Sequence, residues 1–249
     1  MLTGILFILL FIFSVLLFAL PNSNHIKTIA LLGSLGAFGI SIGMLYQFLN
    51  GCPCVLTFNP NILQVLGINF KLSIDGLSIL LILLTTFLTP LIIFSSFESK
   101  TERPKSFYAL ILFMEMALVG VFAASDVLLF YIFYELALIP IYFITALWGG
   151  KDAKKITLKF FIYTLIGSLL MLVAILYVYS LTLGVHSFAF NSFYNVILSG
   201  KDQSWVFLAF FVAFAIKIPI FPFHTWPVHR KCKIIKHLML RKRPPTPFP

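Results

Sequence analysis

Charged side chains are scarce in this sequence. Asp, Glu, Lys and Arg make up 10% of the 249 residues, whereas hydrophobic residues make up 60%. Soluble domains carry charge on roughly 25% of their residues, so this composition cannot cover a surface that faces water. The scarcity of charge excludes an ordinary soluble domain. It predicts an all-α, polytopic membrane protein.

Cysteine and acidic residues are also few. Three cysteines are too few for a disulfide framework, and Cys52 and Cys54 have no His or Cys pair at metal-ligand spacing, so we expect no metal site. The 18 basic and 8 acidic residues give a formal net charge of +10. Most basic residues lie in short loops between apolar runs or in the last 20 positions. This distribution indicates orientation in a membrane and excludes nucleic acid as the expected partner.

Apolar runs long enough to cross a bilayer occur seven times. About 20 helical residues span the hydrocarbon core, and the runs cover residues 2–20, 26–49, 74–97, 106–125, 127–147, 156–181 and 204–223. The first run lacks a basic start and a small-residue cleavage site, so we expect it to be retained as a span. Residues 68–76 alternate apolar and polar side chains, which predicts a short hairpin strand outside the membrane.

The positions of lysine and arginine orient these spans. The loops after the first, third and fifth spans carry seven of them, and the loops after the second and sixth carry two. Because basic loops stay on the cytoplasmic side, this predicts an external N-terminus. We expect an integral protein of a bacterial plasma membrane, with the mitochondrial inner membrane as the alternative.

Glu135 lies in the middle of the fifth run, in the segment FYELALIP. It follows Asp126 by nine residues, which places it about 13 Å along the helix. A charge at that depth costs about 2.5–3.5 kcal/mol on insertion scales. Its neighbours one turn away offer no cation, so we expect a partner from another helix. A protonated Glu135 bonded to a tyrosine such as Tyr134 is the alternative.

Lys217 lies deep in the seventh run, beside two prolines. Pro219 and Pro222 each remove a backbone donor, which predicts free carbonyl groups at about Ala215 and Ile218. Such breaks persist in a membrane only where the freed groups meet protein or water. The sequence therefore predicts a polar cavity at a broken helix. A simple kink with a structural lysine is the alternative.

Glu135 and Lys217 together predict a proton-transfer pair. They lie at membrane depth on different helices, so we expect them to face one another or a shared wet path. Such a pair can pass a proton when the spacing between its members changes.

Three further ionisable residues are candidates for the same proton path. Lys159 opens the sixth run, where snorkelling explains it equally well. Gly167 and Ser168 follow it and predict a face for close helix contact. Glu115 lies in the middle of the fourth run and can pair or line the same cavity. His224 follows the break and titrates near neutrality, so it can relay protons or lie at the interface.

Four long motifs carry a resemblance to a known family. They are, in order, LSIDGLSILLILLTTFL, GVFAASDVLLFYIFYELALIPIYFITALWG, KFFIYTLIGSLLML and AIKIPIFPFHTW. Over residues 65–226 the chain resembles the antiporter-like subunit M (mitochondrial subunit 4) of proton-pumping NADH–quinone oxidoreductase, respiratory complex I. The resemblance implies the N-terminal half of a fourteen-helix fold with a broken seventh helix. Residues 1–73 would hold two helices and an outer loop, and residues 74–226 an incomplete first inverted repeat.

The resemblance also implies roles for single residues. Glu135 matches the glutamate of the family's FxELxLIP motif, Lys217 the lysine before the proline of the broken helix, and Lys159 the lysine that opens the next span. Glu135 and Lys217 would then modulate proton transfer, driven by quinone chemistry elsewhere in the complex.

The implied partners are the other membrane subunits of complex I and the lipid bilayer. NADH, FMN, iron–sulfur clusters and quinone would be bound by other subunits, with no redox site on this chain. A multisubunit cation/proton antiporter and a membrane hydrogenase share the Glu–Lys pair, so both remain alternatives.

Residues 227–249 depart from the family pattern. The family continues after HTW with a turn like xPDAH and more helices, whereas this chain has a basic, proline-rich stretch. We expect a C-terminally truncated product, read in a shifted frame after Trp226. Such a chain could be an inactive fragment whose basic tail touches anionic lipid.

Overall fold

Helices make up most of the computed structural model, which describes residues 2–20, 25–51, 71–98, 102–150, 153–182, 186–218 and 220–221. In chain order the helices are α1 (Leu2–Ala19), α2 (Ile26–Leu49), α3 (Gly76–Ser95), α4 (Pro104–Ala123), α5 (Val127–Leu136), α6 (Leu138–Trp148), α7 (Ala153–Ser180), α8 (Phe190–Tyr194) and α9 (Gly200–Lys217).

Six of the predicted spans are helices of sufficient length and apolar character to cross a membrane. They are α1, α2, α3, α4, the pair α5–α6 and α7. The seventh predicted run overlaps α9 over residues 204–217. Helix α9 carries Lys201, Asp202 and Lys217 and is not among these six. The predicted all-α fold is confirmed, and the chain is an integral membrane protein.

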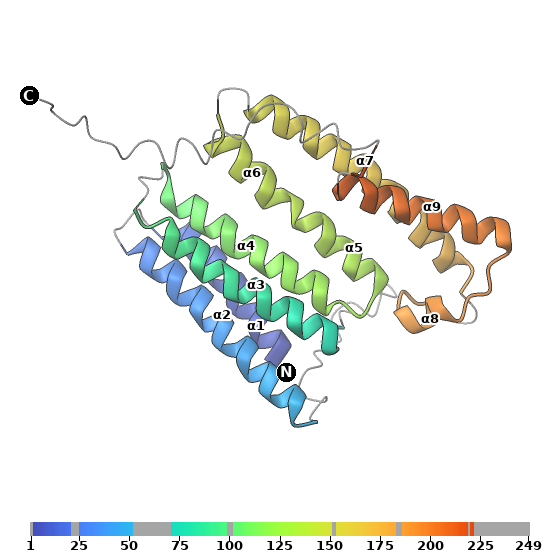
Figure 1. The fold of residues 1–249 in the computed structure, drawn as a ribbon, viewed down its shortest axis with the longest axis horizontal. Helices are drawn as coiled ribbons and strands as arrows, with labels where there is room; N and C mark the ends of the chain where they lie inside the picture. Colours follow the sequence, from blue (N-terminus) through green and yellow to red (C-terminus); the bar gives the residue numbers. More distant parts are fainter. Residues whose placement is uncertain are drawn as a thin grey trace, which may run out of the picture.

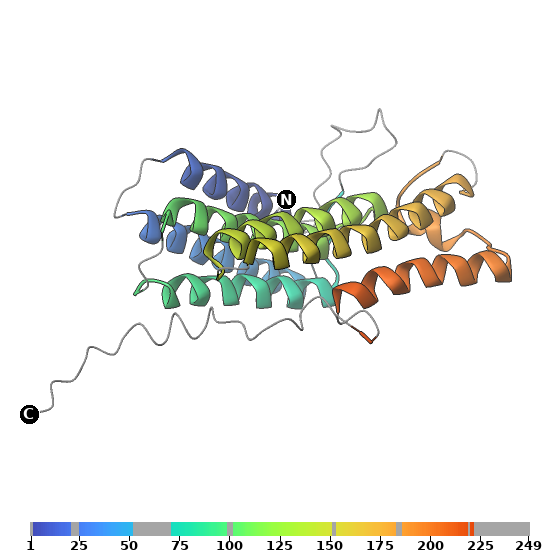
Figure 2. The same ribbon diagram turned by 90° about the horizontal axis from the view of Figure 1, so that it is seen from above.

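The helices lie in a row of three groups. In Figure 1, α1–α4 form one group, α5 and α6 lie beside α4, and α7 and α9 lie beyond them. Figure 2 shows α7 and α9 as separate rods in the same region. The main hydrophobic core lies among α1–α4 and includes Leu6, Leu10, Met44, Ile82, Tyr108 and Leu112. A second cluster joins α5, α7 and α9 through Tyr134, Met171, Ile175 and Ala213.

Small residues bring the helices close together. A Cβ added at Gly120 of α4 would lie 2.6 Å from the ring of Phe133 on α5. A Cβ added at Gly167 of α7 would lie 2.7 Å from Ile216 on α9. The close-contact face predicted around Gly167 is therefore confirmed, and its partner is α9.

The predicted hairpin strand does not form in the part of residues 68–76 that the structure describes. Leu72 makes only an isolated bridge, with Ala124 in the turn between α4 and α5. The amide of Ser73 donates to the carbonyl of Ala123 at 2.8 Å, and the amide of Ser125 to that of Lys71 at 3.0 Å. The segment is extended because it pairs with this distant turn, and Ile68 lies outside the described residues.

Acidic residues cap two helices at this same end of the molecule. Asp75 accepts a hydrogen bond from the amide of Ser78 at the start of α3, at 2.7 Å. This bond holds the pKa of Asp75 below its usual range. Asp126 caps α5 by accepting from the amides of Leu128 and Leu129 at 3.0 and 3.2 Å.

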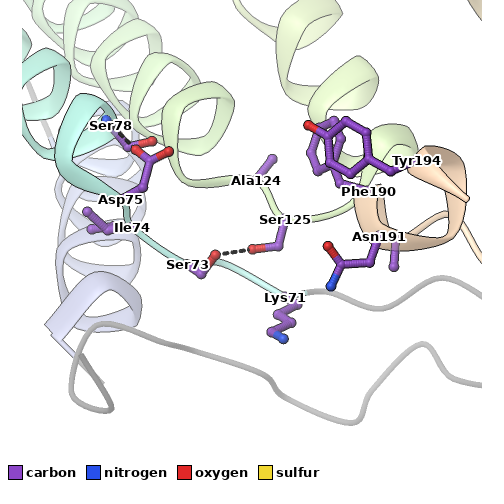
Figure 3. A pocket seen from close by; sticks show the side chains of 11 residues that line it. Lys71, Ser73, Ile74, Asp75, Ser78, Ala124, Ser125, Phe190, Asn191 and Tyr194 are labelled. Carbon is purple, nitrogen blue, oxygen red and sulfur yellow. Dashed lines mark hydrogen bonds between the residues drawn. The ribbon is translucent and has the colours of Figure 1, made fainter.

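A polar pocket lies between these capped helices and α8. It has a volume of about 440 Å³. Ser73 and Ser125 hydrogen-bond across it, and Asn191 and Tyr194 of α8 lie opposite (Figure 3). Because Asp126 is one residue from Ser125 and nine from Glu135, the pocket lies at the start of α5, away from the predicted intramembrane pair.

Candidate functional site

The helix that carries Glu135 is interrupted one residue beyond it. Helix α5 ends at Leu136 and α6 begins at Leu138. Pro140 has no N–H, so the carbonyl of Leu136 lacks its usual helical donor. The fifth run was predicted as one unbroken span, and this interruption was missed. The signal was Pro140 itself, five residues after Glu135 in FYELALIP.

The helix that carries Lys217 ends at that residue. The amide of Ile218 still donates to the carbonyl of Phe214, at 2.8 Å. The amide of Ile220 donates to the carbonyl of Ala215, at 2.9 Å, in place of the bond that Pro219 cannot make. The prediction of a free carbonyl at Ala215 is therefore wrong, because the chain after the break folds back to supply a donor.

The ammonium group of Lys217 contacts Tyr134 on α5. Its Nζ donates to the backbone carbonyl of Tyr134 at 3.1 Å and lies 3.0 Å from the centroid of the Tyr134 ring. This is a hydrogen bond and a cation–π contact at once. Tyr134 as a whole is 8% exposed. Neither contact was predicted from the sequence.

Glu135 follows Tyr134 on α5 and so lies at the same junction. Helix α9 reaches this point through Lys217, which contacts Tyr134. Both charged residues belong to the described part of the chain, and no direct ion pair joins them there. One carboxylate oxygen of Glu135 and the hydroxyl of Tyr134 are each buried without a hydrogen-bond partner. The Tyr134 hydroxyl therefore does not hold Glu135 in this structure.

The other predicted residues lie apart from this junction or outside the described chain. Lys159 is exposed on α7, nine residues before Ser168. Glu115 is 1% exposed on α4, and both its carboxylate oxygens are buried without a hydrogen-bond partner. His224 lies outside the described residues.

The junction of α5, α7 and α9 carries one acidic and one basic side chain. Glu135 and Lys217 are half-buried and opposite in charge. They come from different helices, and each lies within two residues of a helix end. Acid and base groups placed in this way suit proton transfer more than metal binding. Among the residues that the structure describes, no three His, Cys, Asp or Glu side chains gather as metal ligands would.

Comparison with known protein families gives two adjoining matches. The family model for the amino terminus of NADH-ubiquinone oxidoreductase chain 4 matches residues 1–122. The family model for the transmembrane region of NADH:quinone oxidoreductase and Mrp antiporters matches residues 124–230. The second match includes Glu135, Lys159 and Lys217.

Individual relatives agree with these matches. NADH-quinone oxidoreductase subunit M of Rhodobacter capsulatus is 38% identical over 82% of this chain and 41% of its own length. F(420)H(2) dehydrogenase subunit M of Methanosarcina mazei is 36% identical over 86% of this chain and 45% of its own length. The chain thus spans less than half the length of these relatives.

A solved structure shows the same arrangement of helices. A chain in respiratory complex I from Thermus thermophilus with bound NADH superposes with a TM-score of 0.78 at 33% identity, over 91% of this chain and 46% of that one. The protein therefore belongs to the family of NADH-quinone oxidoreductase subunit M and NADH-ubiquinone oxidoreductase chain 4, the antiporter-like membrane subunits.

Proposed function

We propose that the chain acts as a membrane subunit of a proton-pumping NADH:quinone oxidoreductase. In this proposal Glu135 and Lys217 are the intramembrane pair that passes protons, coupled to quinone reduction in other subunits. The observation that carries it is the half-buried placement of both charges at the junction of α5, α7 and α9, each next to a helix end.

The physical basis is the high energy of charge in a bilayer. An opposite charge within about 4–6 Å favours the charged form of a carboxylate, and the effect grows where water is excluded. Changing the distance between Glu135 and Lys217 therefore changes which of them holds a proton. Each residue lies at or next to a helix end, and hinge movements occur at such element ends.

Two other residues have supporting roles in this proposal. Lys159 accepts or delivers protons further along α7, and His224 is a further candidate for the same path. Glu115 is buried on α4, apart from the junction, and has no role in this path. The chain itself would bind no NADH, FMN, iron–sulfur cluster or quinone. Its partners would be the other membrane subunits of the oxidoreductase and the surrounding lipid.

A second candidate function is a subunit of a related proton- or cation-translocating complex. The similarity to a subunit of F(420)H(2) dehydrogenase and to the Mrp antiporter family favours it. The same Glu–Lys pair would serve there, with a different electron donor or an exchanged cation as the driving partner.

Proton pumping in inverted membrane vesicles tests the proposal. The host lacks its own subunit M and carries one of three proteins. These are the 249-residue chain, a chimera that joins residues 1–218 to the remaining part of the R. capsulatus subunit, and the intact R. capsulatus subunit as a control. We expect NADH-driven pumping with the chimera and its loss in Glu135→Gln.

Two outcomes would count against the proposal. A chimera that assembles but never pumps with NADH, yet supports sodium-dependent proton exchange, would favour the antiporter function. A Glu135→Gln chimera that pumps at the unsubstituted rate would remove the pair from the mechanism. Pumping by the 249-residue chain alone would show that residues 1–249 suffice for the activity.

A further inference from the structure

Lys217 is held by a residue that the proposed mechanism does not use. The Lys217 ammonium lies against the face of the Tyr134 ring, 3.0 Å from its centroid, and donates to the Tyr134 carbonyl at 3.1 Å. Tyr134 immediately precedes Glu135. The ammonium therefore rests beside the residue next to the carboxylate, while no direct ion pair joins it to Glu135 in the described structure.

The ring is fixed by aromatic neighbours on two helices. The ring of Phe130, one turn earlier on α5, lies 5.8 Å from that of Tyr134. The ring of Phe214, one turn before Lys217 on α9, meets it edge-on at 6.1 Å and 87°. Phe214 and Lys217 thus approach the same ring from one face of α9. The geometry presents the face of Tyr134 to the ammonium.

The hydroxyl of Tyr134 takes no part in this contact. It is buried without a hydrogen-bond partner, whereas the ring face and the carbonyl both meet Lys217. The contact thus depends on an aromatic ring at position 134 and needs no phenol group. The unbonded hydroxyl also argues against the alternative in which Tyr134 forms a hydrogen bond with a protonated Glu135.

We infer that Tyr134 is a positioning residue that holds the Lys217 ammonium in a separated arrangement, away from Glu135. The inference rests on the proposed function, because it deepens the account of that pair. In the separated arrangement Lys217 lies on Tyr134. In the paired arrangement the ammonium leaves the ring and contacts the Glu135 carboxylate. Tyr134 sets the balance between the two.

The expected size of this effect follows from the contact. A cation–π contact that is shielded from water favours one arrangement by on the order of tenfold or more. Removing the ring face should move Lys217 towards Glu135 by a similar factor. The carbonyl bond remains when the side chain changes, so the shift should be partial.

Nuclear magnetic resonance of the full 249-residue chain in lipid nanodiscs tests the contact directly. Lysine labelled with ¹³C at Cε reports ring currents, and Lys217→Arg assigns the signal. We expect the Lys217 signal to be shifted upfield. This shift should persist in Tyr134→Phe and be lost in Tyr134→Leu, where the signal returns to an ordinary lysine position. Tyr142→Leu, on α6 beyond the helix interruption, is the matched control and should leave the signal in place. An unshifted signal in the unsubstituted chain would overturn the inference.

A second set of variants tests whether Tyr134 keeps the pair apart. Glu135→Gln should barely move the Lys217 signal when Tyr134 is present, since the ammonium is not on the carboxylate. In the Tyr134→Leu chain, Glu135→Gln should move it clearly. Equal responses in both chains would mean that Tyr134 does not control pairing.

A series of fluorinated phenylalanines at position 134 separates the cation–π contact from packing. Each added fluorine withdraws charge from the ring face and changes its size little. We expect the ring-current shift in the 249-residue chain to change stepwise along the series. In vesicles that carry the chimera, the protons moved per NADH should change in the same order. A flat series would overturn the inference. If pumping were insensitive to Glu135→Gln while the NMR results held, the proposed function would fail and the contact would stand.

Discussion

The α1–α4 group and the junction of α5, α7 and α9 bury polar groups in contrasting ways. In the first, Ser14 Oγ donates to the carbonyl of Ala109 at 3.0 Å, and the hydroxyls of Ser41 and Thr86 share a bond of 2.8 Å. Short side chains there bond within a closely packed core of continuous helices. At the junction, the long side chain of Lys217 reaches from α9 to the backbone of α5.

Groups with fixed local partners stabilise one arrangement of helices. The proposed function instead requires that the charged group of Lys217, which lies at a helix end next to an acid, has two arrangements of similar energy. Glu115 is the exception in the α1–α4 group, because it is buried without a hydrogen-bond partner for either oxygen. It is therefore the natural control for Glu135.

The largest expected effect comes from removing the lysine at the junction. In the chimera, Lys217→Met should lower NADH-driven pumping by more than about tenfold, the effect of roughly 1.4 kcal/mol on a barrier. Lys159→Met should cost less, since Lys159 is exposed and can reach the surface. Initial rates of acidification in vesicles measure both. Equal losses, with equal amounts of assembled complex, would show that position at the junction is not what matters.

A smaller effect should follow from crowding the contact between α4 and α5. Gly120→Ala places a Cβ about where the ring of Phe133 lies, 2.6 Å away. Overpacking of this kind costs about 1–3 kcal/mol in free energy of unfolding. Steric-trapping measurements in bicelles can detect it. Gly39→Ala, with no atom within 4 Å of the new Cβ, is the control and should not destabilise the protein.

Crowding the junction itself should affect Lys217 more than stability. Gly167→Ala presses on Ile216, the residue before Lys217, at 2.7 Å from its Cδ1. Because Ile216 ends in a flexible side chain, we expect a cost of about 1 kcal/mol or less. The Lys217 NMR signal should nevertheless move. A signal that stays in place would mean that the α7–α9 contact does not set the position of the ammonium.

The last expected effect concerns the cap of α3, far from the junction. Asp75→Ala should destabilise the protein by about 0.5–2 kcal/mol, as for other lost caps. The pKa of Asp75 is lowered from 3.8 by its bond from the Ser78 amide. Its contribution is therefore complete above that value and is lost as the pH falls through the lower pKa of the folded protein.

Asp75→Asn separates the cap from its charge. The amide oxygen still accepts the bond from Ser78, so the helix start should persist while its acid sensitivity disappears. Thermal unfolding between about pH 2 and 6 would follow this. An unchanged acid transition in Asp75→Asn would mean that other carboxylates cause it.

Much of the fold could be predicted because span length and apolar character fix membrane helices directly. The runs at 2–20 and 26–49 became α1 and α2 within one residue at each end. The predictions failed where backbone hydrogen bonds determine how a helix is interrupted or ends. The interruption between α5 and α6 depends on Pro140, which was overlooked within a continuous apolar run. The carbonyl of Ala215 found a donor in Ile220, a bond that helix periodicity does not reveal.

The site could be predicted in its charges and not in its contacts. Glu135 and Lys217 stood out because charge at membrane depth is costly. The position of the Lys217 ammonium on Tyr134 depends on how α5 and α9 pack, and that packing depends on Gly167 and Ile216. No spacing within one helix encodes such a contact.

The most direct test of the central claim compares the two buried glutamates. Pumping per NADH oxidised is measured in inverted vesicles that carry the chimera with Glu135→Gln or with Glu115→Gln, at equal amounts of assembled complex. We predict a loss of more than about tenfold for Glu135→Gln and a rate within about twofold of the unsubstituted chimera for Glu115→Gln. Unchanged pumping in Glu135→Gln, or an equal loss in Glu115→Gln, would contradict the assignment of proton transfer to the junction of α5, α7 and α9.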